Sequence, residues 1–221
     1  IIQFMDKRIS RNDAVSYVKD GMTLMVGGFL TTGGPNELMD TLSESDVKEL
    51  VLVTNDAAFT DKGLGKLISG KKVKKLITSY IGSNPVAIDL MNESGMEVEF
   101  SPQGTLAERI RSAGAGLGGV LTPTGIGTSV ENGKKIIEVD GREFLLEKPI
   151  KADIAIIGAS IADESGNLFY KGTTRNFNPL MAMAAELVIA EVEEIVPTGT
   201  FEPENIHTPA ILVDHIYLKK N

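Results

Sequence analysis

Short runs of apolar residues alternate with polar or amphipathic segments along most of the chain. Runs of this kind, bounded by turn-forming or polar residues, are typical of buried strands. The third and fourth of them lead directly into polar loops. The sequence predicts strands, together with the loops that follow them, in the segments 22–26, 50–56, 73–84, 96–105, 152–160 and 185–192.

Helices are predicted beside these strands. Ser10 is a candidate N-cap with Asp13 three residues further on, which is the spacing of a capping box, and Gly21 is placed to end that helix. A second helix is expected to start at Pro35, because proline is favoured in the first helical turn. The segment 105–116 predicts a third helix, which ends in glycines.

Strands that alternate with helices predict an α/β fold, with a mostly parallel sheet and helices on both faces in a Rossmann-like arrangement. The carboxyl ends of parallel strands lie at one edge of the sheet, and ligands of such folds bind there. Polar loops follow four of the predicted strands. We therefore expect a binding site at this edge.

The middle of the chain has a different pattern. In the segment 134–147, Asp140-Gly141 separates two strand-like runs, which is a strong signal for a β-hairpin. No Pro- or Ser-rich linker divides the sequence, so we expect a single domain over residues 1–221 with the hairpin as an insertion. Residues 1–4 are expected to precede the native start and to be left from expression.

Composition narrows the classes of function. The formal net charge is −8 and the sequence pI is about 4.9, which argues against nucleic acid or an anionic membrane as the main partner. The chain has no cysteine and two histidines, so thiol chemistry and disulfides are excluded and no metal site is expected. No apolar run approaches the roughly 20 residues of a membrane span, and no secretory signal is visible. We expect a cytoplasmic protein.

The strongest candidate for chemistry is the stretch 20–38, where a strand ends in glycines. Gly27 and Gly28 would let backbone N–H groups approach a ligand closely, because no side chain blocks them. The helix after Pro35 would offer its positive end to an anion, such as a phosphate, a carboxylate or a developing oxyanion. Neither a G-x-G-x-x-G fingerprint nor a Walker loop is present here. The alternative is a tight turn between strand and helix that binds no ligand.

The same stretch carries a family resemblance. Residues 20–35 have the pattern D-G-x-x-L-M-V-G-G-F-x-x-x-G-x-P, and the matching segments that follow are TNDAAF, SYIGSNP, SPQGTLAERIRSAGAGLGGVLTPTGIGT and DESGNLFYKGTTRNFNP. With these motifs the chain resembles the α subunit of family I coenzyme A transferases, and within them the bacterial acetate/butyrate–acetoacetate CoA-transferases. The resemblance covers nearly the whole chain.

The resemblance implies a heteromeric enzyme that moves coenzyme A between a short-chain acyl-CoA and a free carboxylate such as acetate, butyrate or acetoacetate. In the family, a glutamate of the β subunit attacks the thioester, and a mixed anhydride and then a glutamyl-CoA thioester form. That glutamate lies in a Ser-Glu-Asn-Gly motif, which this sequence lacks. A β subunit in an α2β2 or higher assembly is implied, with coenzyme A as a substrate and no permanently bound cofactor.

The resemblance also implies where the site lies. Gln103 in SPQGT belongs to the family's active site, and Asn55 in TNDAAF is a second amide at a strand end. Donors aimed at the oxyanion of thioester attack are worth about 3 kcal/mol each. The alternatives are that Gln103 caps a helix starting at Thr105 and that Asn55 only forms a turn. The candidates for binding coenzyme A are Gly27, Gly28, Phe29, Leu30, Thr31, Thr32 and Gly33.

Three further features have both functional and structural interpretations. Glu164, in Asp-Glu-Ser-Gly-Asn, has the letters of the β-subunit motif in a different order, but such residues favour a structural turn. The glycine-rich segment 114–128 suits either a narrow acyl or pantetheine passage or a mobile loop. Arg175 could meet a carboxylate or a phosphate of coenzyme A, and support of the fold or of a subunit contact is the stronger expectation.

Two rival functions follow from the same fold class. A sugar-phosphate isomerase-like enzyme would also place glycine loops at strand ends, but it needs a general base within the chain. A ligand-sensing or scaffold subunit would carry out no chemistry. Activity of the chain alone would favour the first rival, and no transfer after mixing with a β subunit would favour the second.

Overall fold

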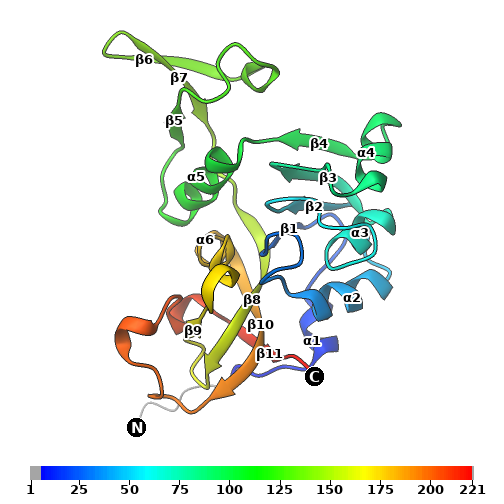
Figure 1. The fold of residues 1–221 in the computed structure, drawn as a ribbon, viewed down its shortest axis with the longest axis vertical. Helices are drawn as coiled ribbons and strands as arrows, with labels where there is room; N and C mark the ends of the chain where they lie inside the picture. The colour runs from blue at the N-terminus through cyan, green and yellow to red at the C-terminus, as the bar shows by residue number, and fades with distance from the viewer. Residues whose placement is uncertain (1–5, 221) are drawn as a thin grey trace.

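The computed structural model describes residues 6–220, so the expectation for residues 1–4 lies outside the described part (Figure 1). Its strands are β1 (Thr23–Val26), β2 (Leu50–Val53), β3 (Val73–Thr78), β4 (Glu97–Phe100), β5 (Val120–Thr122), β6 (Lys135–Val139), β7 (Arg142–Glu147), β8 (Ala152–Asp163), β9 (Leu168–Phe169), β10 (Ala185–Val196) and β11 (His215–Leu218). Its α-helices are α1 (Arg11–Ser16), α2 (Asn36–Glu44), α3 (Gly65–Ser69), α4 (Pro85–Asn92), α5 (Gln103–Gly114) and α6 (Asn178–Ala182). Short 3-10 helices are η1 (Ser129–Glu131), η2 (Gly172–Arg175), η3 (Pro203–Asn205) and η4 (Ala210–Leu212).

The main sheet is parallel throughout its strand order β11-β10-β8-β1-β2-β3-β4, and the short β9 pairs antiparallel with β8. β1 lies near the middle, where Leu24 is in register with Leu52 of β2 and with Ile154 of β8. Because these strands run in one direction, the polar loops after β1 to β4 lie at the same edge. The predicted mostly parallel α/β sheet is confirmed.

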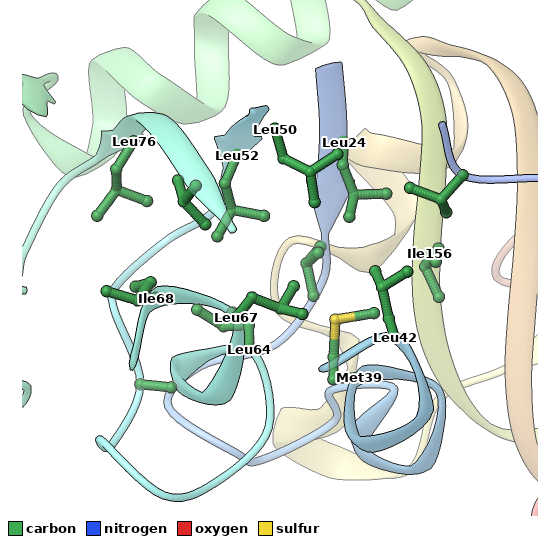
Figure 2. Close-up of a cluster of buried hydrophobic side chains, with 14 of the residues drawn as sticks. Leu24, Met39, Leu42, Leu50, Leu52, Leu64, Leu67, Ile68, Leu76 and Ile156 are labelled. Carbon is green, nitrogen blue, oxygen red and sulfur yellow. The ribbon is translucent and has the colours of Figure 1, made fainter. Parts of the chain in front are cut away.

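Helices cover both faces of this sheet, as predicted (Figure 1). Leu24 of β1 belongs to the core under α1 to α4, whereas the next residue, Met25, belongs to the core under α5 and α6. The two-residue period of a strand thus divides the apolar residues between two cores. Figure 2 shows the first core, in which side chains of α2 and α3, such as Leu42 and Leu67, lie opposite the side chains of the strands.

Some elements differ from their predicted bounds. The capping box at Ser10 is present, but α1 ends at Ser16 rather than at Gly21, whose N–H donates to the carbonyl of Lys48 at 3.1 Å. α5 begins at Gln103, before the predicted start. β8 and β10 each extend over 12 residues, because they pair with each other almost to their ends. Pairing between distant segments therefore sets these bounds.

The predicted hairpin is confirmed. β6 and β7 pair antiparallel around Asp140-Gly141, whose φ angles are 50° and 74°. Positive φ at both central residues is what a type I′ turn requires. Together with β5, the hairpin forms a separate three-stranded sheet that projects away from the main sheet (Figure 1).

A buried ion network joins this small sheet to α5. Arg109 of α5 lies 2.8 Å from the carboxylate of Glu99 on β4 and 3.8 Å from that of Glu147 at the end of β7. Glu147 is 1% exposed and also contacts Lys134 at 2.6 Å. These ion pairs connect α5 to β4 and to the end of β7, so the network fixes the helix that begins at Gln103 relative to both sheets.

The N-terminus of α2 holds a carboxylate of the chain itself. Glu191 of β10 accepts hydrogen bonds from the N–H groups of Glu37 and Leu38, at 3.2 and 2.8 Å, and is 4% exposed. The Pro35 N-cap has no side-chain hydrogen bond, so Glu191 satisfies the first turn. The expectation that this helix end binds the anion of a ligand is therefore wrong. Burial raises the pKa of Glu191 to about 7.

We expect the stability of the chain to depend on pH through Glu191. Its pKa of about 7 lies above the ordinary 4.5, so the folded state binds this proton more tightly; the resulting stabilisation is complete below pH 4.5 and is lost as the pH rises through 7. Glu191→Gln cannot titrate. The free energy of unfolding of the wild type should therefore fall relative to that of the variant by up to about 3 kcal/mol over this range.

Urea unfolding at a series of pH values measures this difference. Glu186→Gln, on an exposed position of the same strand, controls for the loss of a surface carboxylate. A difference between wild type and Glu191→Gln that stays constant with pH would contradict the role given to this carboxylate.

Candidate active site

A cavity of about 420 Å³ lies at the carboxyl edge of the sheet, among the loops after β1, β2 and β3 and at the start of α5. Four of the predicted site residues, from distant parts of the sequence, meet here. The lining consists of Phe29, Leu30, Asn55, Asp56, Ser79, Tyr80, Ser83 and Gln103. A cavity therefore lies at the carboxyl ends of the strands, the edge at which the sequence predicts a binding site.

The two predicted amides are in direct contact. Nε2 of Gln103 donates a hydrogen bond to Oδ1 of Asn55 at 2.7 Å. Asn55 is 2% exposed, whereas Gln103 is exposed at the first residue of α5. The helix therefore does not start at Thr105, and the side chain of Gln103 reaches across to β2 instead of capping it. The alternative role of Gln103 as a helix cap is wrong.

Two aromatic side chains lie at the cavity with about half of their surface exposed. Phe29 is 49% exposed and Tyr80 is 53% exposed, and both line the cavity. Neighbouring exposed apolar groups mark surfaces that bind a ligand or a partner. The cavity therefore combines amide groups in its interior with an open apolar rim.

Sequence patterns alone missed four of the lining residues: Asp56, Ser79, Tyr80 and Ser83. All of them lie in the motifs TNDAAF and SYIGSNP, which follow β2 and β3. Their position after neighbouring parallel strands was the available signal, since such loops converge. The sequence motifs do not show which polar atoms of these residues face one another.

The glycine loop uses its own first N–H groups within the chain. Gly27 donates to the carbonyl of Ile156 at 3.1 Å, and Gly28 donates to Oδ1 of Asn176 at 3.1 Å. Phe29 and Thr32 exchange backbone hydrogen bonds at 3.0 and 2.9 Å, which closes a tight turn. These donors are therefore engaged in holding the loop rather than directed at a ligand.

Close packing explains why two of these positions are glycine. A Cβ atom at Gly27 would collide with Oδ1 of Asn178, which receives the N–H of Gly158 at 3.1 Å. Gly28 has a φ of +122°, which side chains rarely adopt, and its Cβ would lie 3.0 Å from Cα of Gly34. The glycines allow the loop to lie against β8 and the segment that follows it.

The remaining loop residues face elsewhere. Thr31 and Gly33 line a second cavity of about 190 Å³, together with Ser160, Glu191 and Lys219. The loop thus separates two cavities, and Phe29 and Leu30 belong to the one that contains the amide pair.

Neither glutamate that resembles the β-subunit motif lines the amide cavity. Glu164 lies in a turn after β8, where its N–H donates to the carbonyl of Val196 at 3.0 Å, and it lines a separate cavity of about 680 Å³. The turn interpretation of Glu164 is confirmed. The second such glutamate is Glu131, which lies in η1 and accepts the N–H of Gly127 at 2.6 Å. It belongs to the string Ser-Val-Glu-Asn-Gly, which the motifs considered in the sequence did not include.

The segment 114–128 contains the strand β5. A cavity of about 220 Å³ lies between this strand and the start of α5, with Leu121 and Gly104 among its lining residues. Arg175 is exposed at the end of η2 and lines none of the cavities described above. Burial and then the charge of Arg175 lower the pKa of His207.

Residues 6–220, the part of the chain that the structure describes, contain neither a candidate metal site nor a candidate membrane span. No three His, Cys, Asp or Glu side chains in that range are grouped so that they could hold a metal ion. None of the helices in that range is long and apolar enough to cross a membrane.

Solved structures with the same fold include large acyl-CoA-handling enzymes. An acyl-CoA transferase apoenzyme from Escherichia coli O157:H7 superposes with a TM-score of 0.88 at 24% identity, over 99% of this chain and 48% of that chain. This chain therefore spans about half the length of that enzyme. Glutaconate coenzyme A-transferase from Acidaminococcus fermentans gives a TM-score of 0.83 at 20% identity, over 96% of this chain and 75% of that chain.

Sequence comparison identifies closer relatives. The acetoacetyl-CoA:acetate/butyrate CoA transferase alpha subunit of Clostridium acetobutylicum is 53% identical, over 96% of this chain and 98% of the relative. The acetate CoA-transferase subunit alpha of Escherichia coli K12 is 48% identical, over 97% of both chains. The family model for coenzyme A transferase matches residues 8–219. This chain therefore belongs to the coenzyme A transferase family.

Proposed function

We propose that this chain is the α subunit of an enzyme that transfers coenzyme A between a short-chain acyl-CoA and a free carboxylate such as acetate, butyrate or acetoacetate. The observation that carries the proposal is the contact of Gln103 with Asn55 in an open cavity at the carboxyl edge of the sheet. The names and the identity of the relatives support the choice of reaction. The sequence lacks the Ser-Glu-Asn-Gly glutamate, so the nucleophile is expected on a partner β subunit.

The proposed role of the amide pair is to stabilise negative charge. When a glutamate oxygen of the partner bonds to the thioester carbon, the carbonyl electron pair moves onto oxygen; the C–S bond then breaks and coenzyme A leaves as the thiolate. Gln103 uses Nε2 to bond Asn55, and its second N–H remains available to the oxyanion. A donor held in this way before the reaction is worth about 3 kcal/mol. Asn55 acts through Gln103 by holding it.

The loop from Gly27 to Gly33 is proposed to contact the acyl-CoA through side chains and its turn, because its first N–H groups are already used. Phe29 and Tyr80 would supply an apolar wall at the cavity. Their half-exposed rings suit a surface that becomes covered when substrate and the β subunit are bound. We propose a permanent α–β complex, as α2β2 or a higher assembly, with coenzyme A as substrate.

Neither rival function is favoured by the cavity. A sugar-phosphate isomerase needs a free general base, but Asp56, the sole carboxylate among the lining residues, receives N–H groups on both of its oxygens. A scaffold subunit would have no need for a buried amide held against an exposed one.

Removal of the Gln103 amide should slow the reaction. Gln103→Ala in the assembled enzyme should lower kcat by about one to three orders of magnitude, the range for loss of one oxyanion donor. The KM for acyl-CoA should change little, because the interaction strengthens in the transition state. Gln103→Glu keeps the shape of the side chain but removes the N–H donor, so its kcat should stay as low as that of Gln103→Ala.

Steady-state kinetics with acetoacetyl-CoA and acetate measure both constants. A raised KM at unchanged kcat would assign Gln103 to ground-state binding.

Substitution in the glycine loop should abolish activity through the backbone. In Gly28→Val, the φ of +122° and the contact with Gly34 should distort the turn that carries Phe29 and Leu30. Such strain costs about 1–3 kcal/mol, so the chain should remain folded. Gly21→Val is the matched control, because Gly21 also has a positive φ, of +76°, but lies in open space away from the cavity.

Thermal unfolding and kcat of both glycine variants are the measurements. Both variants should lose stability, and only Gly28→Val should lose activity. Wild-type turnover in Gly28→Val would show that the loop conformation is not required for transfer.

The covalent intermediate should form on the partner subunit. The purified chain alone should transfer no coenzyme A. In the complex, acyl-CoA followed by borohydride should reduce a glutamyl thioester to an alcohol, and intact-mass measurement should locate the change on the partner while this chain keeps its mass. Modification of Glu164 or Glu131, or turnover by the chain alone, would overturn the two-subunit proposal.

A further inference from the structure

Asp56 is a buried carboxylate that contacts both sides of the amide cavity. It follows Asn55 in the loop after β2 and is 3% exposed. Its Oδ2 accepts the N–H of Leu30 at 2.9 Å and Nδ2 of Asn55 at 2.7 Å, and its Oδ1 accepts the N–H of Ala58 at 2.8 Å. One side chain thus links the glycine loop after β1 to the amide pair after β2 and β4.

The chemistry of a carboxylate gives this chain of hydrogen bonds a direction. An ionised carboxylate accepts hydrogen bonds and donates none, so the NH2 group of Asn55 has to face Asp56. The carbonyl oxygen of Asn55 then has to face Gln103, and it receives Nε2 of Gln103 at 2.7 Å. Ser79 holds the backbone of Asn55, because its hydroxyl donates to the backbone carbonyl of Asn55 at 2.7 Å, and the same hydroxyl lies 3.5 Å from Oδ1 of Asn55.

The direction of the chain decides what Gln103 presents to the cavity. Its amide is held with the nitrogen, not the oxygen, against Asn55, so one N–H is used and the second has no acceptor among the described residues. If the amide of Asn55 were reversed, its NH2 would face Gln103 and would draw the carbonyl oxygen of Gln103 toward itself. The orientation of the Gln103 amide, which is linked to Asp56 through two successive hydrogen bonds, therefore depends on Asp56.

Asp56 also holds the opposite wall of the cavity. Leu30 has a φ of 53°, which is unusual for a leucine, and its N–H is the one that Asp56 receives. A non-glycine residue in this region costs on the order of 1 kcal/mol or more and persists when the surroundings hold it. The same Oδ2 atom therefore fixes the turn that carries Phe29 and the amide that contacts Gln103.

We propose that Asp56 is a positioning residue for the transfer reaction: it sets the orientation of the Asn55 and Gln103 amides and so keeps an N–H of Gln103 directed to the oxyanion. This inference rests on the proposed oxyanion role of Gln103. Asp56 itself need not touch the substrate, because both of its oxygens are occupied by donors of the chain.

A double-mutant cycle in the complex of this chain with its β subunit tests the proposal. Asp56→Ala should lower kcat by about 10- to 1,000-fold, as loss of the Gln103 donor does, with little change in the KM for acetoacetyl-CoA. In a Gln103→Ala background, the same substitution should lower kcat by a factor at least about threefold smaller than in the wild type, because its effect through Gln103 is already lost and only its hold on the Leu30 turn remains.

Asp56→Asn is the conservative variant and is the one most certain to fold, since its shape is unchanged. Its single oxygen can take the side with two donors, Leu30 and Asn55, and leave the N–H of Ala58 unmatched. The kcat of Asp56→Asn should therefore be higher than that of Asp56→Ala. In the Gln103→Ala background, Asp56→Asn should not lower kcat further. If Asp56→Ala does not fold, the cycle is measured with Asp56→Asn.

Asp163 offers a matched control. It is 2% exposed and likewise accepts three donors, the N–H groups of Ser165 and Asn167 and Nδ2 of Asn167, in the turn after β8. Asp163→Asn should lower the melting temperature without changing kcat. The control separates a loss of stability from a loss of positioning.

The possible results distinguish this inference from the function on which it rests. If Gln103→Ala leaves kcat unchanged, the oxyanion role of Gln103 fails and the positioning role of Asp56 fails with it. If Gln103→Ala lowers kcat but Asp56 substitutions have the same effect in both backgrounds, Asp56 acts independently of Gln103 and this inference alone is wrong.

Discussion

Parallel pairing of β1 with β2 on one side and β8 on the other is the constraint on which the rest of the molecule depends. It places the ends of strands from both halves of the sequence at one edge of the sheet. The loop after β1 can then lie against Asp56 after β2 and against Asn176 and Asn178 beyond β8. Each of these contacts requires the strands to be parallel and adjacent. The cavity is a consequence of the sheet order and not of any single loop.

Buried carboxylates hold several segments at the carboxyl edge of the sheet through hydrogen bonds. Glu191 occupies the N-terminus of α2, Asp163 shapes the turn after β8, and Asp56 holds the turn after β1. In each case a carboxylate satisfies backbone N–H groups that would otherwise be left without partners. Backbone donors near the cavity are thereby largely used inside the chain. Side chains remain to meet a ligand: the amide of Gln103 and the exposed rings of Phe29 and Tyr80.

This division of labour fits one half of a shared active site. The chain supplies a rigid amide and an apolar rim, and the nucleophile is proposed to come from the partner. The small antiparallel sheet around β6 and β7 is fixed to α5 by Arg109 and Glu147, so the helix that begins at Gln103 is held from both of its sides. Rigidity of this kind is what electrostatic stabilisation of a transition state requires, because a donor that is already oriented need not reorganise during the reaction.

Local patterns were sufficient for the elements and for part of the site. Short apolar runs, the Ser10 capping box and Asp140-Gly141 act over a few residues, so the strands, the start of α1 and the hairpin could be predicted. The family motifs indicated Gln103 and Asn55. Their hydrogen bond, which joins residues 48 positions apart, could not be read from them.

Tertiary structure decided the partners of the polar groups. Glu191 reaches the N-terminus of α2 from 153 residues away, so a helix end that looks like an anion site in the sequence is already filled. Asp56 looks like an ordinary turn residue until Leu30, 26 residues earlier, is placed against it. The physical reason is the same in both cases. A sequence determines which donors and acceptors a segment carries, but strand order and packing determine which of them meet, and only the unmatched ones are left for function.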